Sequence, residues 1–436
     1  WSSNTRAMSI YSVLGLRTRW QKQLPFRNTV YPFLGLFLAI HALWMFYDTT
    51  ITSYEHHRPK RKDIQITESS PLSPFYSPGQ QYDGFTRAFP VWNNPFPCGL
   101  LEDEYHMRTR AAAKEGILYV KQVEASTTIF SSVTANIARS KGKQQTQAQN
   151  NSTANVCTTR LTSQRAMRYR DRVPEKSFLW SVVREPVSRL VSKYYHYGEV
   201  KKKSGTYTTM LSRFQNFIFN LEAQDYGYYF RSLAVNRRMN PGQKEHERDT
   251  RELLESYDFL GVSERMDESL AVLKIILNLG FQDVLYLPIP KAKDIKAKLA
   301  DGSDGGFVDY YDRWSKDKCR PILKPEVPLE MKEWFYSEEF EAFIEADVMF
   351  YKAVNASLDK TISELGRDLV EKTVKQVQWA QKVAEKECQN ARFPCSSQGE
   401  IQKETDCLFS NVGCGYKCLD EVGTKLLHDP EFQALF

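Results

Sequence analysis

The sequence predicts an α/β fold in which a parallel β-sheet is covered by helices on both faces. Apolar segments of strand length alternate along the chain with segments of helical period, and this alternation is typical of parallel sheets. A long, mostly helical segment and a cysteine-rich tail follow this part of the chain. We therefore expect an α/β core with a helical, cysteine-rich C-terminal extension.

The strand candidates are short and apolar. Residues 178–183 show no alternation with polar residues, which indicates a central strand that is buried on both faces. The strands are expected at residues 116–120, 177–183, 258–262 and 283–287.

Helical periodicity follows the first and third strand candidates. Ile129, Val133 and Ile137 recur at spacings of four within residues 126–139, so one face of that segment is apolar. Residues 266–279 predict a second helix, whereas the polar residues 140–156 predict a loop.

One segment near the N-terminus is suited to a membrane. Residues 30–47 (VYPFLGLFLAIHALWMFY) carry no formal charge, and their length is at the low end of the range for a spanning helix. The residues before this segment include several Arg and Lys and no acid. The positive-inside rule therefore predicts a single-pass type II anchor, with the N-terminus in the cytosol and the rest lumenal. A cleaved signal peptide and a buried helix are the alternatives.

Composition divides the chain into five parts. The segment after the anchor is rich in proline and shows no lasting apolar period, which is typical of a stem. The expected parts are a cytosolic tail at 1–29, the anchor at 30–47, the stem at 48–111, the main domain at 112–355 and the C-terminal extension at 356–436.

The cysteines favour an oxidising compartment. All eight follow the predicted anchor, and an even number on the lumenal side indicates disulfides. The tail holds five of them without the paired C-x2-C spacing of zinc sites, so one must reach Cys98, Cys157 or Cys319. Glycosylation sequons at Asn150, Asn151 and Asn355 fit the same compartment.

The net charge of +6 is small for 436 residues. It does not argue for a nucleic-acid partner, but it permits a basic pocket for an anionic ligand.

The strand at 178–183 runs directly into a motif with the chemistry of a phosphate site. Arg184 follows the strand, Pro186 suits the first position of a helix, and Ser188 and Ser192 lie beside the apolar face of that helix. Ligands of open α/β sheets bind at the carboxyl ends of the strands. An arginine, hydroxyls and a helix N-terminus together suit a phosphate monoester, whereas a lone surface arginine beside a structural helix is the alternative.

At these residues the chain resembles a known enzyme family. The stretch REPVSRLVSKYY at 184–195 is similar to the 3'-phosphate-binding motif of sulfotransferases that use 3'-phosphoadenosine 5'-phosphosulfate (PAPS). Membrane-bound glycan sulfotransferases of the heparan-sulfate 2-O and galactose-3-O types carry an Arg-Asp-Pro-x-x-Arg-x-x-Ser-x-Tyr-Tyr form, and Glu185 replaces its Asp here. The resemblance implies a P-loop NTPase-like sheet. It also implies that Arg184 and Ser192 bind the 3'-phosphate, that Ser188 helps, and that Arg189 is structural.

The loop after the first strand resembles the family's 5'-phosphosulfate loop less closely. Ser126, Thr127 and Thr128 match hydroxyl positions and start a helix, where N–H groups and hydroxyls can hold a phosphate. The family's lysine position is taken by Val123, and Lys121 comes two residues early. Lys121 is expected to stabilise the charge that develops on the leaving phosphate; an ordinary charge at a strand end is the alternative.

The catalytic base is left open by the sequence. Sulfuryl transfer requires a group that accepts the proton of the acceptor hydroxyl. Residues 140–176 hold no histidine, so the candidates are Glu124 in the loop and His196 after the motif helix.

The sequence as a whole predicts a Golgi membrane sulfotransferase with a lumenal catalytic domain. PAPS would be its co-substrate, a glycan its acceptor, and no metal would take part; a homo-oligomer is left open. A P-loop kinase is disfavoured because G-x-x-x-x-G-K-[ST] is absent. A catalytically weak or inactive relative that binds glycan or nucleotide is one alternative, and sulfation of a protein tyrosine or a small alcohol is another.

Overall fold

The computed structural model describes most of the main domain and of the C-terminal extension, all within the compact unit 66–436. The described residues are 66–67, 73, 75, 82–94, 98–100, 114–123, 125, 127–148, 155–157, 159–163, 166–198, 209–220, 226–237, 239, 245–289, 306–308, 319–322, 325, 327–397, 400–408 and 411–434. The predicted anchor at 30–47 and the cytosolic tail at 1–29 lie outside them. Within the described ranges, no helix is both long and apolar enough to cross a membrane.

A four-stranded parallel sheet forms the centre of the fold, with the order β4-β2-β5-β6. Its strands are β2 (Gly116–Lys121), β4 (Thr159–Ser163), β5 (Ser177–Val183) and β6 (Phe259–Val262). Every residue of β5 is buried, as expected for a strand covered on both faces. The predicted α/β architecture with a parallel sheet is therefore confirmed.

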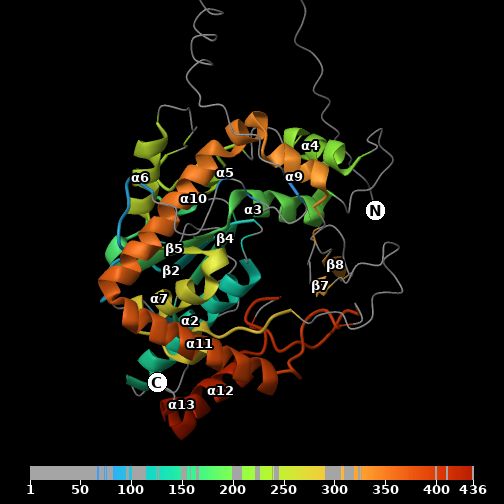
Figure 1. Ribbon diagram of the computed structural model, residues 1–436. Coiled ribbons are helices and arrows are strands. Elements are labelled where there is room, and N and C mark those ends of the chain that lie inside the picture. Colours follow the sequence, from blue (N-terminus) through green and yellow to red (C-terminus); the bar gives the residue numbers. More distant parts are fainter. Residues whose placement is uncertain are drawn as a thin grey trace, which may run out of the picture. The chain divides into compact units, whose positions relative to one another are not determined.

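Helices cover both faces of this sheet (Figure 1). On one side lie α2 (Thr127–Ala148), α7 (Met266–Ile276) and α11 (Arg367–Glu387). On the other lie α3 (Pro186–Lys193), α5 (Tyr228–Leu233) and α10 (Glu338–Leu365). The chain therefore leaves β2 on one face to reach β4, and leaves β5 on the other face to reach β6.

The remaining elements pack around this frame. α6 (His246–Ser256) contacts α5 and α10, α8 (Phe281–Val284) contacts α2, and α12 (Tyr416–His428) contacts α11. The others are α4 (Met210–Asn220), α9 (Leu329–Phe335) and α13 (Pro430–Ala434), with the short strand pairs β1–β3 (Cys98–Leu100, Asn155–Cys157) and β7–β8 (Gly306–Val308, Arg320–Ile322).

Three sequence-based expectations about elements were wrong. The predicted strand at 283–287 is the end of α8 followed by chain without regular structure. The predicted loop at 140–156 is helical up to Ala148, where α2 ends. β4 was not expected because its sequence, TRLTS, is polar; it lies at the edge of the sheet, where polar side chains are tolerated.

Aromatic side chains fill the core. Trp180 at the middle of β5 is fully buried, and its ring centroid lies 4.7 Å from that of Tyr119 and 6.0 Å from that of Phe130. The side chains of the two strands thus pack against each other and against α2. Truncating a fully buried tryptophan costs about 3–5 kcal/mol, so this cluster holds the two central strands in register.

Disulfides hold the C-terminal extension together. The three bonds among described cysteines are Cys319–Cys395, Cys388–Cys418 and Cys407–Cys414. The prediction of disulfides in the tail is confirmed, and the tail cysteine that has no partner within the tail, Cys395, pairs with Cys319. The boundary expected at 355/356 falls inside α10, so that helix continues from the main domain into the extension.

The C-terminal extension also contacts α2 through an ion pair and a hydrogen bond. Arg139 of α2 makes a two-pronged ion pair with Asp420 of α12, with nitrogen–oxygen distances of 2.7 and 2.5 Å. The Ser132 hydroxyl accepts a hydrogen bond from the Gly413 N–H at 2.9 Å. These contacts join residues 281 positions apart in the sequence.

The sequon at Asn355 is not available for glycosylation. Asn355 is 5% exposed on α10, and its side-chain amide donates to the Tyr351 carbonyl at 3.1 Å. A glycan requires an accessible asparagine. The sequons at Asn150 and Asn151 lie outside the described residues.

Candidate functional site

The topology of the sheet marks one place for a ligand. The chain moves outward from β2 in one direction and from β5 in the other, so the switch point lies between these two strands. Ligands of open α/β sheets bind at the carboxyl ends of the strands beside such a point. Lys121 ends β2 and Arg184 follows β5. Since Val120 is paired with Ser181, Lys121 is level with Val182, and Arg184 lies two residues farther along.

Lys121 is a half-buried cation at the end of β2. Burial disfavours its charged form and lowers the pKa of its ammonium below the ordinary value of 10.5. Among the described residues it makes no hydrogen bond and no ion pair. A charged group in such a place is costly unless an anion accompanies it, so the end of β2 is suited to receive an anionic ligand.

The loop after β2 is a tight turn that leads into α2. The Ala125 N–H donates to the Gln122 carbonyl at 3.4 Å, and the Val123 N–H donates to the Tyr228 hydroxyl at 2.9 Å. Glu124 and Ser126 lie outside the described residues, and of Thr127 the backbone alone is described, as the first residue of α2.

Thr128 lies in the first turn of α2. Its carbonyl accepts a hydrogen bond from the Ser132 hydroxyl at 2.8 Å, and its half-buried side chain lines a small cavity of about 30 Å³. Leu287, Pro394 and Cys414 line the same cavity. This volume suits one or two water molecules, not a nucleotide, so the cavity is not the ligand site.

Arg184 differs from Lys121 because an acid, Glu264, lies beside it. Its Nε lies 3.8 Å from the Glu264 carboxylate, and its side chain is 29% exposed. Glu264 lies in the 3-10 turn Ser263–Arg265 that follows β6. Its carboxylate accepts hydrogen bonds from the Glu185 N–H at 3.1 Å and from the Tyr351 hydroxyl at 3.0 Å. Burial raises the pKa of Glu264, although these hydrogen bonds and Arg184 act in the opposite direction. The sequence assigned no role to Glu264 or Tyr351 in the site.

Glu185 corrects one part of the phosphate-site hypothesis. Its carboxylate caps α3 by accepting the N–H groups of Val187 at 3.1 Å and Ser188 at 2.7 Å. The N-terminus of α3 therefore already holds an anion and does not present these donors to a phosphate. Pro186 occupies the first turn, as expected. An anion at this strand end must be held by side chains.

The hydroxyls of α3 lie on one side of the helix. Ser188 and Ser192 are four residues apart and half-buried, so they share a face. The opposite, apolar face packs against α4, α9 and α10 through Val187, Leu190, Val191 and Tyr194. Both serines are thus compatible with a ligand beside Arg184.

His196 lies far from the strand ends. It is half-buried in the π-helical turn Tyr194–Gly198 that continues α3. Ten residues separate it from Pro186, which corresponds to about 15 Å along a helix. The structure brings Lys121 and Arg184 to one edge of the sheet but does not bring His196 to that edge.

Arg189 is an interior residue. Its side chain is fully buried, its guanidinium lies 3.9 Å from the ring centroid of Tyr228, and its Nη2 lies 3.7 Å from the Asp347 carboxylate. Asp347 accepts the N–H groups of Tyr228 at 3.1 Å and Tyr229 at 2.9 Å. Arg189 therefore supports α5 from within the core.

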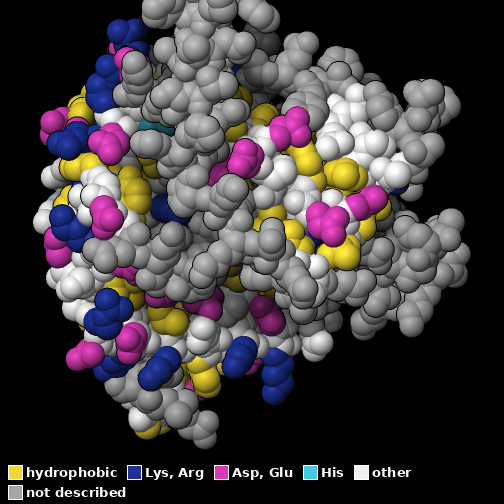
Figure 2. All heavy atoms as spheres, turned by 45° about the horizontal axis from the view of Figure 1, so that its top comes forward, with side chains coloured by type: hydrophobic (Ala, Val, Ile, Leu, Met, Phe, Trp, Pro, Cys, Tyr) yellow, Lys and Arg dark blue, Asp and Glu magenta, His cyan; other side chains and the backbone are white. Residues whose placement is uncertain are grey.

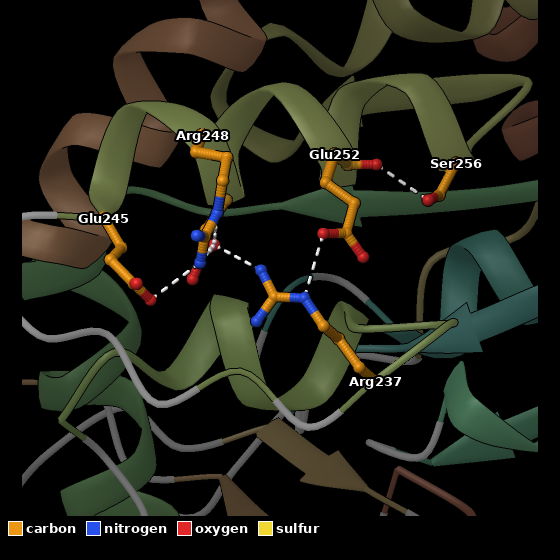
Figure 3. Close-up of polar contacts among 6 residues, drawn as sticks. Arg237, Glu245, Arg248, Glu252 and Ser256 are labelled. Atoms are coloured by element: carbon orange, nitrogen blue, oxygen red, sulfur yellow. Dashed lines mark hydrogen bonds and ion pairs between the residues drawn. The ribbon is translucent and has the colours of Figure 1, made fainter.

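Several charged side chains on α6 and on the segment before it are paired with one another. Arg237 donates to Asp249 at 2.6 Å and to Glu252 at 3.1 Å, and Arg248 donates to Glu245 at 2.7 Å, all along α6 (Figure 3). Basic and acidic side chains are interspersed over much of the described face in Figure 2. These pairs link α6 to the segment before it and leave little net charge there for an anionic ligand.

Neither relatives of known function nor a metal site among the described residues narrows the choice of function. No family model matches the chain, and no curated protein matches it. Within the described part of the chain, no group of three or more His, Cys, Asp or Glu side chains is arranged to hold a metal ion.

Proposed function

We propose that this protein is a sulfotransferase that moves a sulfuryl group from PAPS to a hydroxyl of a glycan. The observation that carries the proposal is the pair of cations at the topological switch point, Lys121 beyond β2 and Arg184 beyond β5. A nucleotide with phosphates on its 3' and 5' positions requires two separate anion sites, and these neighbouring strand ends offer two.

The residues divide between the two phosphates of the donor. Lys121 and the hydroxyls of Ser126, Thr127 and Thr128 would hold the 5' side, and Arg184 with Ser188 and Ser192 would hold the 3'-phosphate. The fold would then be a P-loop NTPase-like sheet whose β2 loop serves the 5' side. The half-buried ammonium of Lys121 fits this assignment, because an incoming phosphate would supply the anion that it lacks among the described residues.

The transfer is an in-line displacement at sulfur. The acceptor oxygen forms a bond to sulfur as the bond between sulfur and the bridging phosphate oxygen breaks, and the electron pair leaves with 3'-phosphoadenosine 5'-phosphate. Lys121 would stabilise the charge on that departing oxygen. The acceptor proton passes to a base, for which Glu124 is the remaining candidate, because His196 lies about 15 Å along the helix from Pro186.

The proposed location is the Golgi lumen, with a single-pass type II anchor in its membrane. The disulfides support a lumenal or secreted domain, because such bonds persist in oxidising compartments.

Calorimetry with the lumenal part, residues 48–436, tests the proposal. We expect 3'-phosphoadenosine 5'-phosphate to bind more tightly than adenosine 5'-monophosphate, since the second phosphate adds contacts to Arg184. Transfer of radiolabelled sulfate from PAPS to a panel of glycans would then identify the acceptor. Equal or undetectable binding of the two nucleotides would refute the donor assignment. Binding without transfer to any glycan, tyrosine peptide or small alcohol would indicate a catalytically inactive relative.

A further inference from the structure

Two consecutive tyrosines connect the two ends of the candidate site. Tyr228 and Tyr229 are the first residues of α5, which contributes no side chain to the proposed phosphate contacts. The Tyr228 hydroxyl accepts the N–H of Val123, in the loop after β2, at 2.9 Å. The Tyr229 hydroxyl accepts the N–H of Arg184 at 2.9 Å and also donates to the carbonyl of Arg184. One turn of helix thus contacts the main chain at both strand ends.

Helix geometry explains how two consecutive tyrosines can contact the ends of two different strands. Consecutive residues of a helix point about 100° apart, so one ring is directed to the β2 loop and the other to the end of β5. Both side chains are buried, at 3% and 0% exposure. Burial raises the pKa of Tyr229 well above its ordinary value, which keeps the hydroxyl protonated and able to donate to a carbonyl while accepting an N–H.

The start of α5 is held in place by the interior of the protein. The Asp347 carboxylate accepts the backbone N–H groups of both tyrosines, at 3.1 and 2.9 Å. The Arg189 guanidinium packs on the Tyr228 ring, with its central carbon 3.9 Å from the ring centroid. Gly227 precedes the helix with φ of 57°, a left-handed conformation that suits glycine. The two tyrosines are therefore held in fixed positions, and each restrains a segment that carries a proposed ligand-binding group.

We propose that Tyr228 and Tyr229 are positioning residues that set the two phosphate subsites separately. Tyr228 fixes the loop that receives the 5' side of the nucleotide, and Tyr229 fixes the main chain of Arg184 and so the direction of its guanidinium toward the 3'-phosphate. This inference rests on the proposed donor. It adds that the two tyrosines keep the distance between the 5' and the 3' subsite constant. Neither tyrosine touches the reacting atoms.

Phenylalanine substitutions provide the test, because each removes one hydroxyl and keeps the ring. Binding of adenosine 5'-monophosphate, adenosine 3'-monophosphate and the 3',5'-bisphosphate is measured by calorimetry on residues 48–436. Tyr229→Phe is expected to weaken the two 3'-phosphorylated ligands about fivefold and to leave the 5'-monophosphate unchanged. Tyr228→Phe is expected to weaken the two 5'-phosphorylated ligands by a similar factor and to spare the 3'-monophosphate.

Tyr257→Phe is the matched control. The Tyr257 hydroxyl is buried and donates to the Leu233 carbonyl at 2.9 Å, at the other end of α5. This variant loses a comparable hydrogen bond without touching either strand end, so all three affinities should stay as in the unsubstituted protein.

Amide hydrogen exchange gives a readout that does not depend on a ligand. Tyr228→Phe should speed exchange at Val123 and not at Arg184, and Tyr229→Phe should do the reverse. Uniform losses for all three nucleotides, or no losses, would overturn the positioning role while leaving the donor assignment intact. If the unsubstituted protein binds none of the nucleotides, the donor assignment itself fails and the inference fails with it.

Discussion

The ends of β2 and β5 hold their cations in opposite ways. Both residues are partly buried, but Lys121 has no acidic partner among the described residues, whereas Arg184 lies beside Glu264. The N-terminus of α3 next to Arg184 is also occupied, by the Glu185 carboxylate. A ligand phosphate at the end of β2 would meet the ammonium of Lys121, which has no partner among the described residues. A phosphate at the end of β5 would instead compete with the Glu264 carboxylate for Arg184. We infer that the β2 end contributes more to affinity and the β5 end more to discrimination.

Removing the cation at β2 should have the largest effect. Lys121→Met keeps the length of the side chain and deletes its charge, so affinity for any adenosine 5'-phosphate should fall by about 2–3 kcal/mol, the range of a hydrogen bond to a charged group. The free energy of unfolding should rise by about 1 kcal/mol, because a half-buried charge that has no partner among the described residues is lost. Calorimetry and urea denaturation measure the two changes.

Lys141→Met is the matched control for that variant. Lys141 lies on α2, and its Nζ donates to the Asn278 carbonyl at 3.1 Å. Its replacement should leave nucleotide affinity unchanged. A Lys121 variant that is less stable and binds normally would show that the lysine is an ordinary structural residue.

The pH dependence of nucleotide binding should also reveal the role of the Lys121 ammonium at the end of β2. Burial lowers the pKa of Lys121 in the folded protein below 10.5, and a bound phosphate would raise it again. Affinity for the 5'-phosphate should therefore fall as pH rises through the lowered pKa, before an ordinary lysine would lose its proton. Without ligand, the contribution of Lys121 to stability should become less unfavourable over the interval from the lowered pKa to 10.5.

The measurement compares the pH profiles of the unsubstituted protein and Lys121→Met. Subtracting the second profile from the first removes the titration of tyrosines and of other lysines. Parallel profiles would mean that Lys121 stays away from the phosphate.

Arg184→Ala should have a smaller and more selective effect. Affinity for the 3',5'-bisphosphate should fall by about 1.5 kcal/mol, or roughly tenfold, and affinity for adenosine 5'-monophosphate should hardly change. Competition binding with the two nucleotides measures the difference. Equal losses for both would make Arg184 a structural residue and would remove the contrast between the strand ends.

Glu264→Gln should have the smallest effect. The substitution removes the negative charge 3.8 Å from the Arg184 Nε and keeps an oxygen that can accept the Glu185 N–H. Affinity for the 3'-phosphate should rise by about 0.5 kcal/mol, in keeping with the modest strength of partly exposed ion pairs. A clear loss of affinity would instead indicate that Glu264 orients Arg184.

The sequence was most informative where local pattern decides structure. The strands at 116–121 and 177–183, the helix opened by Pro186, and the tail disulfides follow from apolar runs, turn chemistry and cysteine number. β4 was missed because an edge strand of polar residues carries no apolar signal. Segment 283–287 was misjudged because four apolar residues suit a short helix end as well as a strand.

The candidate site was harder to predict than the fold. Glu264 and Tyr229 reach Arg184 from positions 80 and 45 residues farther along the chain, and a pattern of neighbouring residues contains no trace of such contacts. The capping role of Glu185 could have been inferred, because a carboxylate is stabilising near the N-terminus of a helix. The partial burial of Lys121 could not, since it depends on what packs over the end of β2.

The ties between α2 and the C-terminal extension bear on the order of events during synthesis. Arg139 and Ser132 find their partners 281 residues later, in a part of the chain that is synthesised after the four strands of the central sheet. Helix α2 therefore lacks these contacts until the C-terminal extension has been synthesised, and closing so long a loop has an entropic cost. A chain that stops before Asp420 would keep the sheet's strands but lack the ion pair with Arg139. Loss of the segment from Gly413 onward is therefore expected to destabilise the folded domain, because α2 would lose both of these contacts.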